Sequence, residues 1–242
     1  MANTKMDHLI AADRGLAAVR TLEPAGSEIF STKETDRIRS ANLKIALKNL
    51  EGLHHHLCPR QVLGARIALF AGEYLDLKLP RADKRLFVFV ETDGCALDGI
   101  ALTTGTNVGK RSMRVMDYGK VAATFVDTQT NTAVRIAPNA GIRKIARNLA
   151  PDMPNRWSAQ LEGYQIMPTR VLLTTQPVDL TLDIKKLISS PRVRVTCDKC
   201  SEEILNQRQV EHAGTVLCAA CALDAYYVPI SHTESEMLYS SA

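Results

Sequence analysis

Hydrophobic and polar positions change their spacing several times along the 242-residue chain. Apolar side chains recur at mostly helical spacing over 31–52, after a Ser/Thr start and before a glycine stop. A second helical pattern begins at Pro59, and because proline is favourable at the first helical position, a helix is predicted to start just after Cys58. The segment LHHHLCP, residues 53–59, therefore lies at a junction between two helices.

The middle of the chain mixes short strand patterns with helical ones. Strands are predicted within four segments, RLFVFVET (85–92), MRVMDYG (113–119), VAATFVD (121–127) and AVRIAP (133–138). Helices are predicted within 139–151 and 157–166, and a returning strand is predicted over VDLTLDI, residues 178–184. Because helices and strands do not alternate as regular βαβ units, the predicted fold class is α+β.

Composition and charge divide the chain. With 45% hydrophobic and 23% charged residues it is typical of a globular protein. Residues 191–242 carry four basic and seven acidic side chains, whereas the remainder has a net charge of +7. This change of sign predicts a boundary, and the acidic C-terminal part argues against binding of nucleic acid. The predicted organisation is a core domain (1–188, with N-terminal helices within about 1–50), a linker (189–194), a small module (195–230) and a tail (231–242).

The chain has no segment typical of export or membrane insertion. No apolar run approaches the roughly 20 residues that cross a bilayer. The first residues, MANTKMDHLIAADRG, lack the basic-then-apolar order of a signal peptide. These features predict a cytoplasmic protein without membrane contact, where free thiols persist.

Four of the six cysteines form two CxxC pairs separated by 17 residues, namely Cys197, Cys200, Cys218 and Cys221. The four thiolates can converge on one tetrahedral ion if the intervening segment returns as a β-hairpin through HAGT, residues 212–215. A closed four-thiolate shell leaves no open position for a substrate. The pattern therefore predicts a zinc ribbon whose zinc ion is structural.

The junction segment offers a second ligand set. The residue before a proline is biased toward extended geometry, and in an extended segment His54, His56 and Cys58 would share one face while His55 points away. Two imidazoles and a thiolate suit zinc or iron with open coordination positions. From this motif alone, three partly solvated histidines beside a buried thiol are an equally good interpretation.

The sixth cysteine favours the metal or redox interpretation. Cys95 follows a predicted strand, where a strand-to-helix turn would place its thiol near the amide-rich start of a helix. Cys58 occupies the same kind of position, and thiolates are favoured there. Asp98, one helical turn after Cys95, is a candidate ligand or general base.

Three segments in this order, LHHHLCPRQVLGARIA, ETDGCALDGIALTTGTNVGK and VMDYGKVAATF, precede the four-cysteine ribbon. Together they resemble the FmdE-like family of formylmethanofuran dehydrogenase proteins over about residues 35–225. The resemblance implies an α+β core that forms a homodimer, often followed by a zinc ribbon, with a cleft around His54, His56, Cys58 and Cys95. The later matching positions are Asp98, Gly105, Gly109, Lys110, Asp117, Gly119 and Lys120. The family name refers to an enzyme whose redox chemistry belongs to its other components, so the resemblance assigns no reaction.

The chain departs from the family pattern at three positions. His55 and Arg60 stand where the family usually has glycine, and Thr106 stands where it commonly has cysteine. The missing cysteine makes an all-thiol redox centre less favourable, and Arg60 adds a candidate anion-binding group.

Two lysines near the later motifs are further candidates for binding an anion. GTNVGKRS is not a nucleotide-binding P-loop, because its glycines are separated by three residues and arginine follows the lysine. Lys110 remains a candidate for an anionic substrate group, with solvated surface charge as the alternative. Asp117 and Lys120 either form a turn capped by the aspartate or orient a ligand.

These residues define two candidate functions. The first is a metal-dependent enzyme, or a redox or cofactor-handling accessory protein, that acts on a small anionic molecule with a second metal, zinc or iron, in the core cleft. Its candidate catalytic residues are Cys58, Cys95, His56 and Asp98, its substrate-binding residues Arg60, Lys110 and Lys120, and its cleft metal ligands His54, His56 and Cys58. The second is a metal-sensing or regulatory module whose ribbon contacts a partner.

Overall fold

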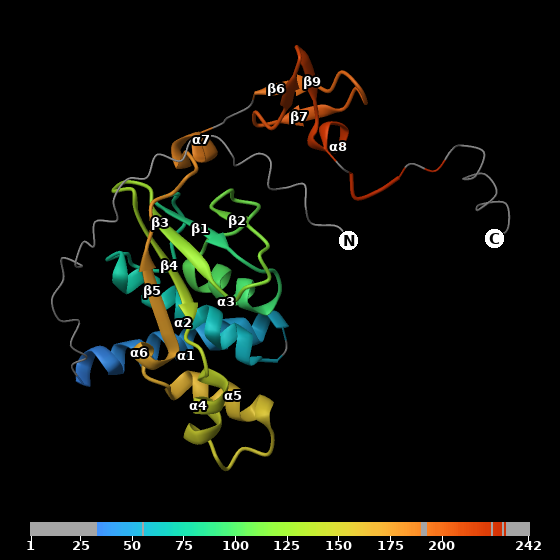
Figure 1. The fold of residues 1–242 in the computed structure, drawn as a ribbon. Coiled ribbons are helices and arrows are strands. Elements are labelled where there is room, and N and C mark those ends of the chain that lie inside the picture. The colour runs from blue at the N-terminus through green and yellow to red at the C-terminus, as the bar shows by residue number, and fades with distance from the viewer. Residues whose placement is uncertain (1–32, 55, 190–192, 224, 229, 231–242) are drawn as a thin grey trace. The chain divides into compact units, whose positions relative to one another are not determined.

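The computed structural model describes residues 33–54, 56–189, 193–223, 225–228 and 230 (Figure 1). The predicted helices before residue 33, His55, most of the predicted linker and the predicted tail lie outside the described residues. No helix within the described ranges combines the length and the apolar character needed to cross a membrane.

Two helices flank the junction segment. Helix α1 spans Lys33–His54 and helix α2 spans Pro59–Tyr74, so α2 starts at the predicted proline. Cys58 precedes α2 with extended backbone (φ −123°, ψ 156°), as expected for a residue before proline. The Cys58 amide donates to Gln61 Oε1 over 2.7 Å, which satisfies one of the donors left over at a helix start.

Helix α1 continues past the predicted stop at Gly52 and includes His54. The extended alternation predicted for His54, His56 and Cys58 therefore does not reach back to His54. A glycine whose Cβ position meets nothing within 4 Å is no obstacle to a helix, because the cost is only about 1 kcal/mol.

A five-stranded sheet forms the centre of the core, in the order β2-β1-β3-β4-β5. β1 and β2 pair in parallel through the crossover helix α3 (Cys95–Thr104), and the other neighbours are antiparallel. The strand bounds are β1 (Leu86–Val90), β2 (Met113–Val115), β3 (Ala123–Asp127), β4 (Thr132–Pro138) and β5 (Leu173–Pro177). The four predicted strands before β5 are confirmed, and the mixed sheet with separate helices confirms the α+β class.

The prediction of a returning strand over 178–184 is wrong, because β5 ends at Pro177. Val178, Leu180 and Ile184 instead pack against Phe87 and Phe89 on one face of the sheet. Their alternation reflects burial of a loop and of the first residue of α7 (Ile184–Ser189), without pairing in the sheet.

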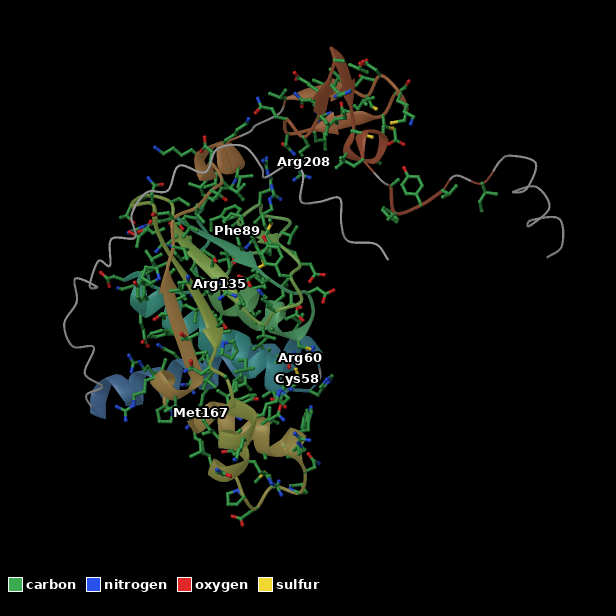
Figure 2. All side chains as sticks on the ribbon, in the orientation of Figure 1. Cys58, Arg60, Phe89, Arg135, Met167 and Arg208 are labelled. Atoms are coloured by element: carbon green, nitrogen blue, oxygen red, sulfur yellow. The ribbon has the colours of Figure 1, made fainter. Side chains whose placement is uncertain are left out.

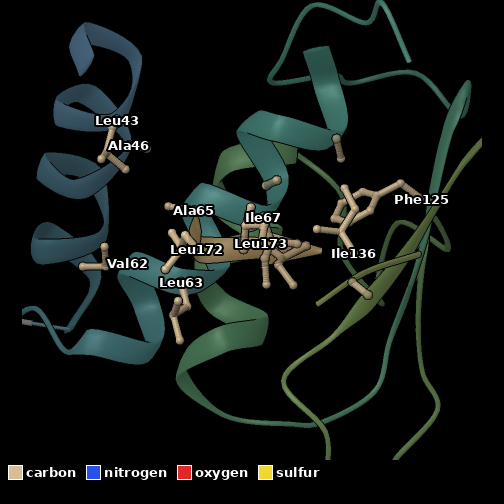
Figure 3. Close-up of a cluster of buried hydrophobic side chains, with 14 of the residues drawn as sticks. Leu43, Ala46, Val62, Leu63, Ala65, Ile67, Phe125, Ile136, Leu172 and Leu173 are labelled. Carbon is tan, nitrogen blue, oxygen red and sulfur yellow. The ribbon is translucent and has the colours of Figure 1, made fainter. Parts of the chain in front are cut away.

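The large hydrophobic core lies between the opposite face of the sheet and the helices (Figure 3). Val88 and Phe125 from the sheet, Ile67 from α2, and Leu43 from α1 are all buried there. Alternate residues of β1 thus face opposite layers, and all five of its residues are buried. The Phe87–Val90 end of this strand leads directly into the loop before α3.

Three further helices, α4 (Ile142–Leu149), α5 (Arg156–Ile166) and α6 (Thr169–Leu172), follow the predicted helical segments 139–151 and 157–166. Arg66 of α2 fastens the end of α5 to the core by donating to the carbonyls of Tyr164 and Met167, each over 2.8 Å. Burial lowers the pKa of Arg66 to about 10, which still leaves it charged at neutral pH.

The C-terminal module consists of two short hairpins and one helical turn. β6 (Arg194–Thr196) pairs with β7 (Glu203–Leu205), β8 (Val210–His212) pairs with β9 (Thr215–Leu217), and α8 covers Ala219–Ala222. The predicted hairpin through HAGT is confirmed, and Ala213 and Gly214 both have positive φ there, as tight two-residue hairpin turns require.

Candidate metal centres and anion-binding residues

Helices α2 and α3 cross in backbone contact at Gly64 and Gly99. A Cβ atom on Gly64 would lie 2.2 Å from the carbonyl oxygen of Ala96, and one on Gly99 would lie 2.4 Å from that of Gln61. Such distances are shorter than side chains tolerate, so both positions require glycine. The close crossing fixes the start of α2 relative to the start of α3.

This arrangement brings Cys58 and Cys95 together. Cys58 immediately precedes α2, Cys95 is the first residue of α3, and both are half-buried. Burial, a hydrogen bond with the Cys58 thiol and the charge of that thiolate all raise the pKa of Cys95, whereas the Arg60 guanidinium acts in the opposite direction. Two thiols in hydrogen-bond contact resist simultaneous ionisation unless a cation neutralises them.

The other residues of the predicted cleft surround this thiol pair by chain position. His56 is exposed two residues before Cys58, and Asp98 is half-buried in the first turn of α3. Arg60 is exposed on the first turn of α2, at the same end of that helix as Cys58 (Figure 2). His54 belongs to the end of α1.

Lys110 lies at the other end of α3. The helix ends at Thr104, and Gly105 caps it with left-handed backbone (φ 75°). Ten helical residues span about 15 Å, so the segment that carries Lys110 begins about that far from Cys95. The structure therefore does not bring Lys110 to the thiol pair, and the Lys110 amide donates to Asn107 Oδ1 in a local turn over 2.7 Å.

The segment from Asp117 to Lys120 is held against the end of β1. The amides of Tyr118 and Lys120 both donate to the Glu91 carbonyl over 3.0 Å, four residues before Cys95. Asp117 Oδ1 accepts a hydrogen bond from the Gly119 amide over 3.0 Å, so Asp117 caps the turn. The exposed side chain of Lys120 lines a cavity of about 510 Å³.

A buried ion pair, missed in the sequence, supports the same end of β1. Arg135 donates to the two Glu91 oxygens over 2.6 and 2.7 Å, and only 8% of the Glu91 side chain is exposed. The hydrogen bonds to Glu91 raise the pKa of Arg135. The available signal was an acidic residue directly after five consecutive apolar positions, because a carboxylate there needs a buried partner.

The C-terminal module brings four sulfur ligands to one point. One ligand atom from each of Cys197, Cys200, Cys218 and Cys221 lies within 4.8 Å of the others. Zinc–sulfur bonds of about 2.3 Å place tetrahedral ligands about 3.8 Å apart, and the Sγ atoms of Cys200 and Cys218 are 3.9 Å apart. The donor set therefore fits a tetrahedral metal ion.

Backbone amides already favour one thiolate in this cluster. The amides of Cys200 and Cys218 donate to Cys197 and lower its pKa to about 6. The hydrogen bond with Cys218, together with burial, raises the pKa of Cys221 to about 12. Such opposed shifts are typical of thiols crowded around the position of a cation.

Comparison with known proteins gives three matches. The family profile described as FmdE, Molybdenum formylmethanofuran dehydrogenase operon, matches residues 53–174, a range that includes both cysteines of the thiol pair and Lys120. A probable S-adenosyl-L-methionine-binding protein of Archaeoglobus fulgidus is 24% identical over 226 residues, which cover 86% of this chain. The chain spans 60% of the length of that relative.

The third match is a crystal structure of an FmdE-like protein of tungsten formylmethanofuran dehydrogenase from Syntrophus aciditrophicus. It superposes with a TM-score of 0.51 at 20% sequence identity and covers 77% of this chain and 95% of its own. At this identity the likeness shows a shared fold.

Proposed function

Because the chain belongs to the FmdE family, we propose that its core binds a transition-metal ion through Cys58 and Cys95 and uses it on a small anionic molecule. The observation that carries the proposal is the contact between these two thiols at the starts of α2 and α3. The protein is then a metal-dependent enzyme or a cofactor-handling accessory protein. The Archaeoglobus relative's binding of S-adenosyl-L-methionine belongs to a longer chain and is not needed here.

The ligand set proposed for the core metal combines sulfur and nitrogen. Cys58 and Cys95 supply thiolates, His56 supplies an imidazole, and His54 is the candidate for the fourth position. Mixed sulfur and imidazole ligands suit zinc or iron. Either metal, when bound, polarises a coordinated water or substrate oxygen as a Lewis acid.

Two charged residues beside the thiol pair have complementary roles in the proposal. Arg60 is close enough to oppose the raised pKa of Cys95, so its guanidinium can also attract an anionic group of the substrate. Asp98, in the first turn of α3, is positioned on the Cys95 side of the helix and serves as the candidate general base. Lys110 has no part in this site because it lies at the far end of α3.

The second metal is proposed to be zinc in the four-cysteine module. Four thiolates complete its coordination, so this ion stabilises a fold of only a few short strands and takes no part in turnover. The predicted boundaries, a core to residue 188 and a ribbon over 195–230, form part of the same proposal.

Metal analysis of the full-length protein tests the core site. The wild type should contain two metal ions per chain, and Cys58→Ser or Cys95→Ser should each reduce the content to one without a change in circular dichroism. Thr106→Ser is the matched control, because Thr106 is buried at the other end of α3 and should leave both ions bound. Two ions retained in both cysteine variants would refute the core centre.

A second function is favoured by apolar residues exposed at the end of the ribbon. Leu223, Tyr226 and Val228 are 54%, 99% and 87% exposed. Such side chains suit contact with a protein partner, as in a metal-sensing regulatory module. A core metal with no exchangeable ligand position would favour this function over catalysis.

The homodimer implied by the family resemblance is also part of the proposal. Light scattering at micromolar concentration should give about twice the chain mass of 26.6 kDa. A single species at the chain mass would contradict it.

A further inference from the structure

A cavity of about 510 Å³ opens where α2, the start of β3 and the end of β4 meet. Its walls are largely apolar, with Leu63 from α2, Ala137 from β4 and Ile142 from α4. The volume falls within the range of about 300–1,000 Å³ found for small-molecule sites. Lys120 connects the cavity with the thiol pair, because its amide is bound to Glu91, four residues before Cys95.

The charge around this cavity is positive. Lys120, Arg135 and Arg143 line it, and none of its described lining residues is acidic. Arg135 is neutralised by its paired hydrogen bonds to Glu91. Lys120 and Arg143, which form no ion pair with another described residue, therefore leave about two positive charges beside an apolar pocket.

A buried phenol adds a directional donor. Tyr164 is 2% exposed and lines the cavity. Burial raises its pKa, so the phenol stays neutral, while Arg143 hydrogen-bonds to it. A hydroxyl oxygen that accepts from Arg143 retains its own hydrogen, which can be donated to a ligand.

Asn139 does not compete for the same ligand. Its Nδ2 group donates to the backbone carbonyls of Val171 and Leu173 over 3.1 and 3.0 Å, so it secures the segment before β5. The donors that remain for a ligand are the ammonium of Lys120, the guanidinium of Arg143 and the hydroxyl of Tyr164.

We infer that this cavity binds a small organic anion, a carboxylate or phosphate monoester that carries an apolar body. The anionic group lies between Lys120 and Arg143, and the apolar body lies along Leu63, Ala137 and Ile142. The inference deepens the proposed function and rests on it in one respect, since Lys120 is one of the residues assigned there to an anionic substrate.

Calorimetric titration of the full-length protein tests the charge requirement. The probes are 2-naphthoate and its neutral isostere 2-naphthamide, with phenyl phosphate as the second anion. Both anions should bind at least about tenfold more tightly than the amide, because each hydrogen bond to a charged group contributes about 1.5–3 kcal/mol. Lys120→Gln and Arg143→Gln should each weaken naphthoate binding by about tenfold.

Two further variants test the location. Ala137→Leu keeps every charge but fills the apolar part of the cavity, so it should abolish binding of naphthoate. Lys144→Gln removes a positive charge from the exposed residue next to Arg143, and because Lys144 does not line the cavity it should leave binding unchanged. Thermal unfolding of each variant confirms that it is folded at the titration temperature.

The outcomes separate this inference from the metal proposal. Naphthoate binding that survives in Cys58→Ser and Cys95→Ser, with one metal ion lost, supports both sites. Two metal ions retained in those variants would refute the core metal, while pocket binding would still stand. Equal binding of naphthoate and naphthamide, an equal loss in Lys144→Gln and Arg143→Gln, or no binding of either anion at millimolar concentration would overturn the pocket.

Discussion

Replacement of Gly64 by alanine tests whether the crossing of α2 and α3 positions the two thiols. The new Cβ would lie 2.2 Å from the Ala96 carbonyl oxygen and 3.1 Å from the Gly99 Cα, both backbone atoms. Ordinary contact begins at 3.4 Å, so the helices must separate by about 1 Å. Because neither backbone atom can rotate away, the cost cannot be relieved by a change of rotamer.

The expected loss of stability follows from two opposed effects. Overpacking a close contact costs about 1–3 kcal/mol, and a backbone contact belongs at the upper end of that range. Alanine in place of glycine inside a helix returns about 1 kcal/mol. We therefore expect Gly64→Ala to lower the free energy of unfolding by about 2 kcal/mol and to weaken binding of the core metal at least about tenfold.

Gly52→Ala is the matched control, because a Cβ there meets nothing within 4 Å and the residue also lies inside a helix. It should stabilise the protein by about 0.5–1 kcal/mol and leave both metal ions in place. Urea unfolding gives the two free energies, and competition with a chromophoric chelator gives the metal affinities. If Gly64→Ala matched Gly52→Ala in both measurements, the crossing would have no role in bringing the thiols together.

Three further changes probe the ribbon, the buried pair and the sheet. Cys200→Ser should remove one metal ion and expose the ribbon to protease, while the core ion stays bound; loss of the core ion alone would contradict the assignment. Glu91→Gln should lower the free energy of unfolding by about 1–2 kcal/mol in urea titrations, because Arg135 loses its carboxylate partner, and an unchanged value would remove the pair from the account. Hydrogen bonds from Arg85 hold the pKa of Asp127 below its usual range, so this carboxylate stabilises the fold above its unfolded pKa and loses that contribution as pH falls through the lower folded pKa. Asp127→Asn should therefore flatten the fall in stability below about pH 4, and a wild-type pH dependence would refute the assignment.

Local signals in the sequence were sufficient for the parts of the site that depend on single elements. Pro59 predicted the start of α2 because proline fits the first helical position, and the run of apolar residues before Cys95 predicted a strand followed by a helix. The ribbon followed from the spacing of its cysteines, because CxxC pairs converge on one ion in many folds.

Other features depend on tertiary contacts that periodicity does not contain. The alternation over 178–184 was interpreted as a strand, although its apolar side chains cover a face of the sheet from a loop. Lys110 follows α3 in sequence, but only the direction of that helix shows that it lies far from Cys95. The crossing at Gly64 and Gly99 was missed because a glycine inside a helix signals close packing only when its neighbour is known.

The central claim is that Cys58 and Cys95 hold one metal ion. Anomalous difference maps at the zinc and iron edges, from crystals of the full-length protein prepared without chelator, test it most directly. The account predicts two peaks per chain, one among the four ribbon sulfurs and one about 2.3 Å from the Sγ atoms of both Cys58 and Cys95. A single peak in the ribbon, with the two core thiols bonded to no metal, would contradict it.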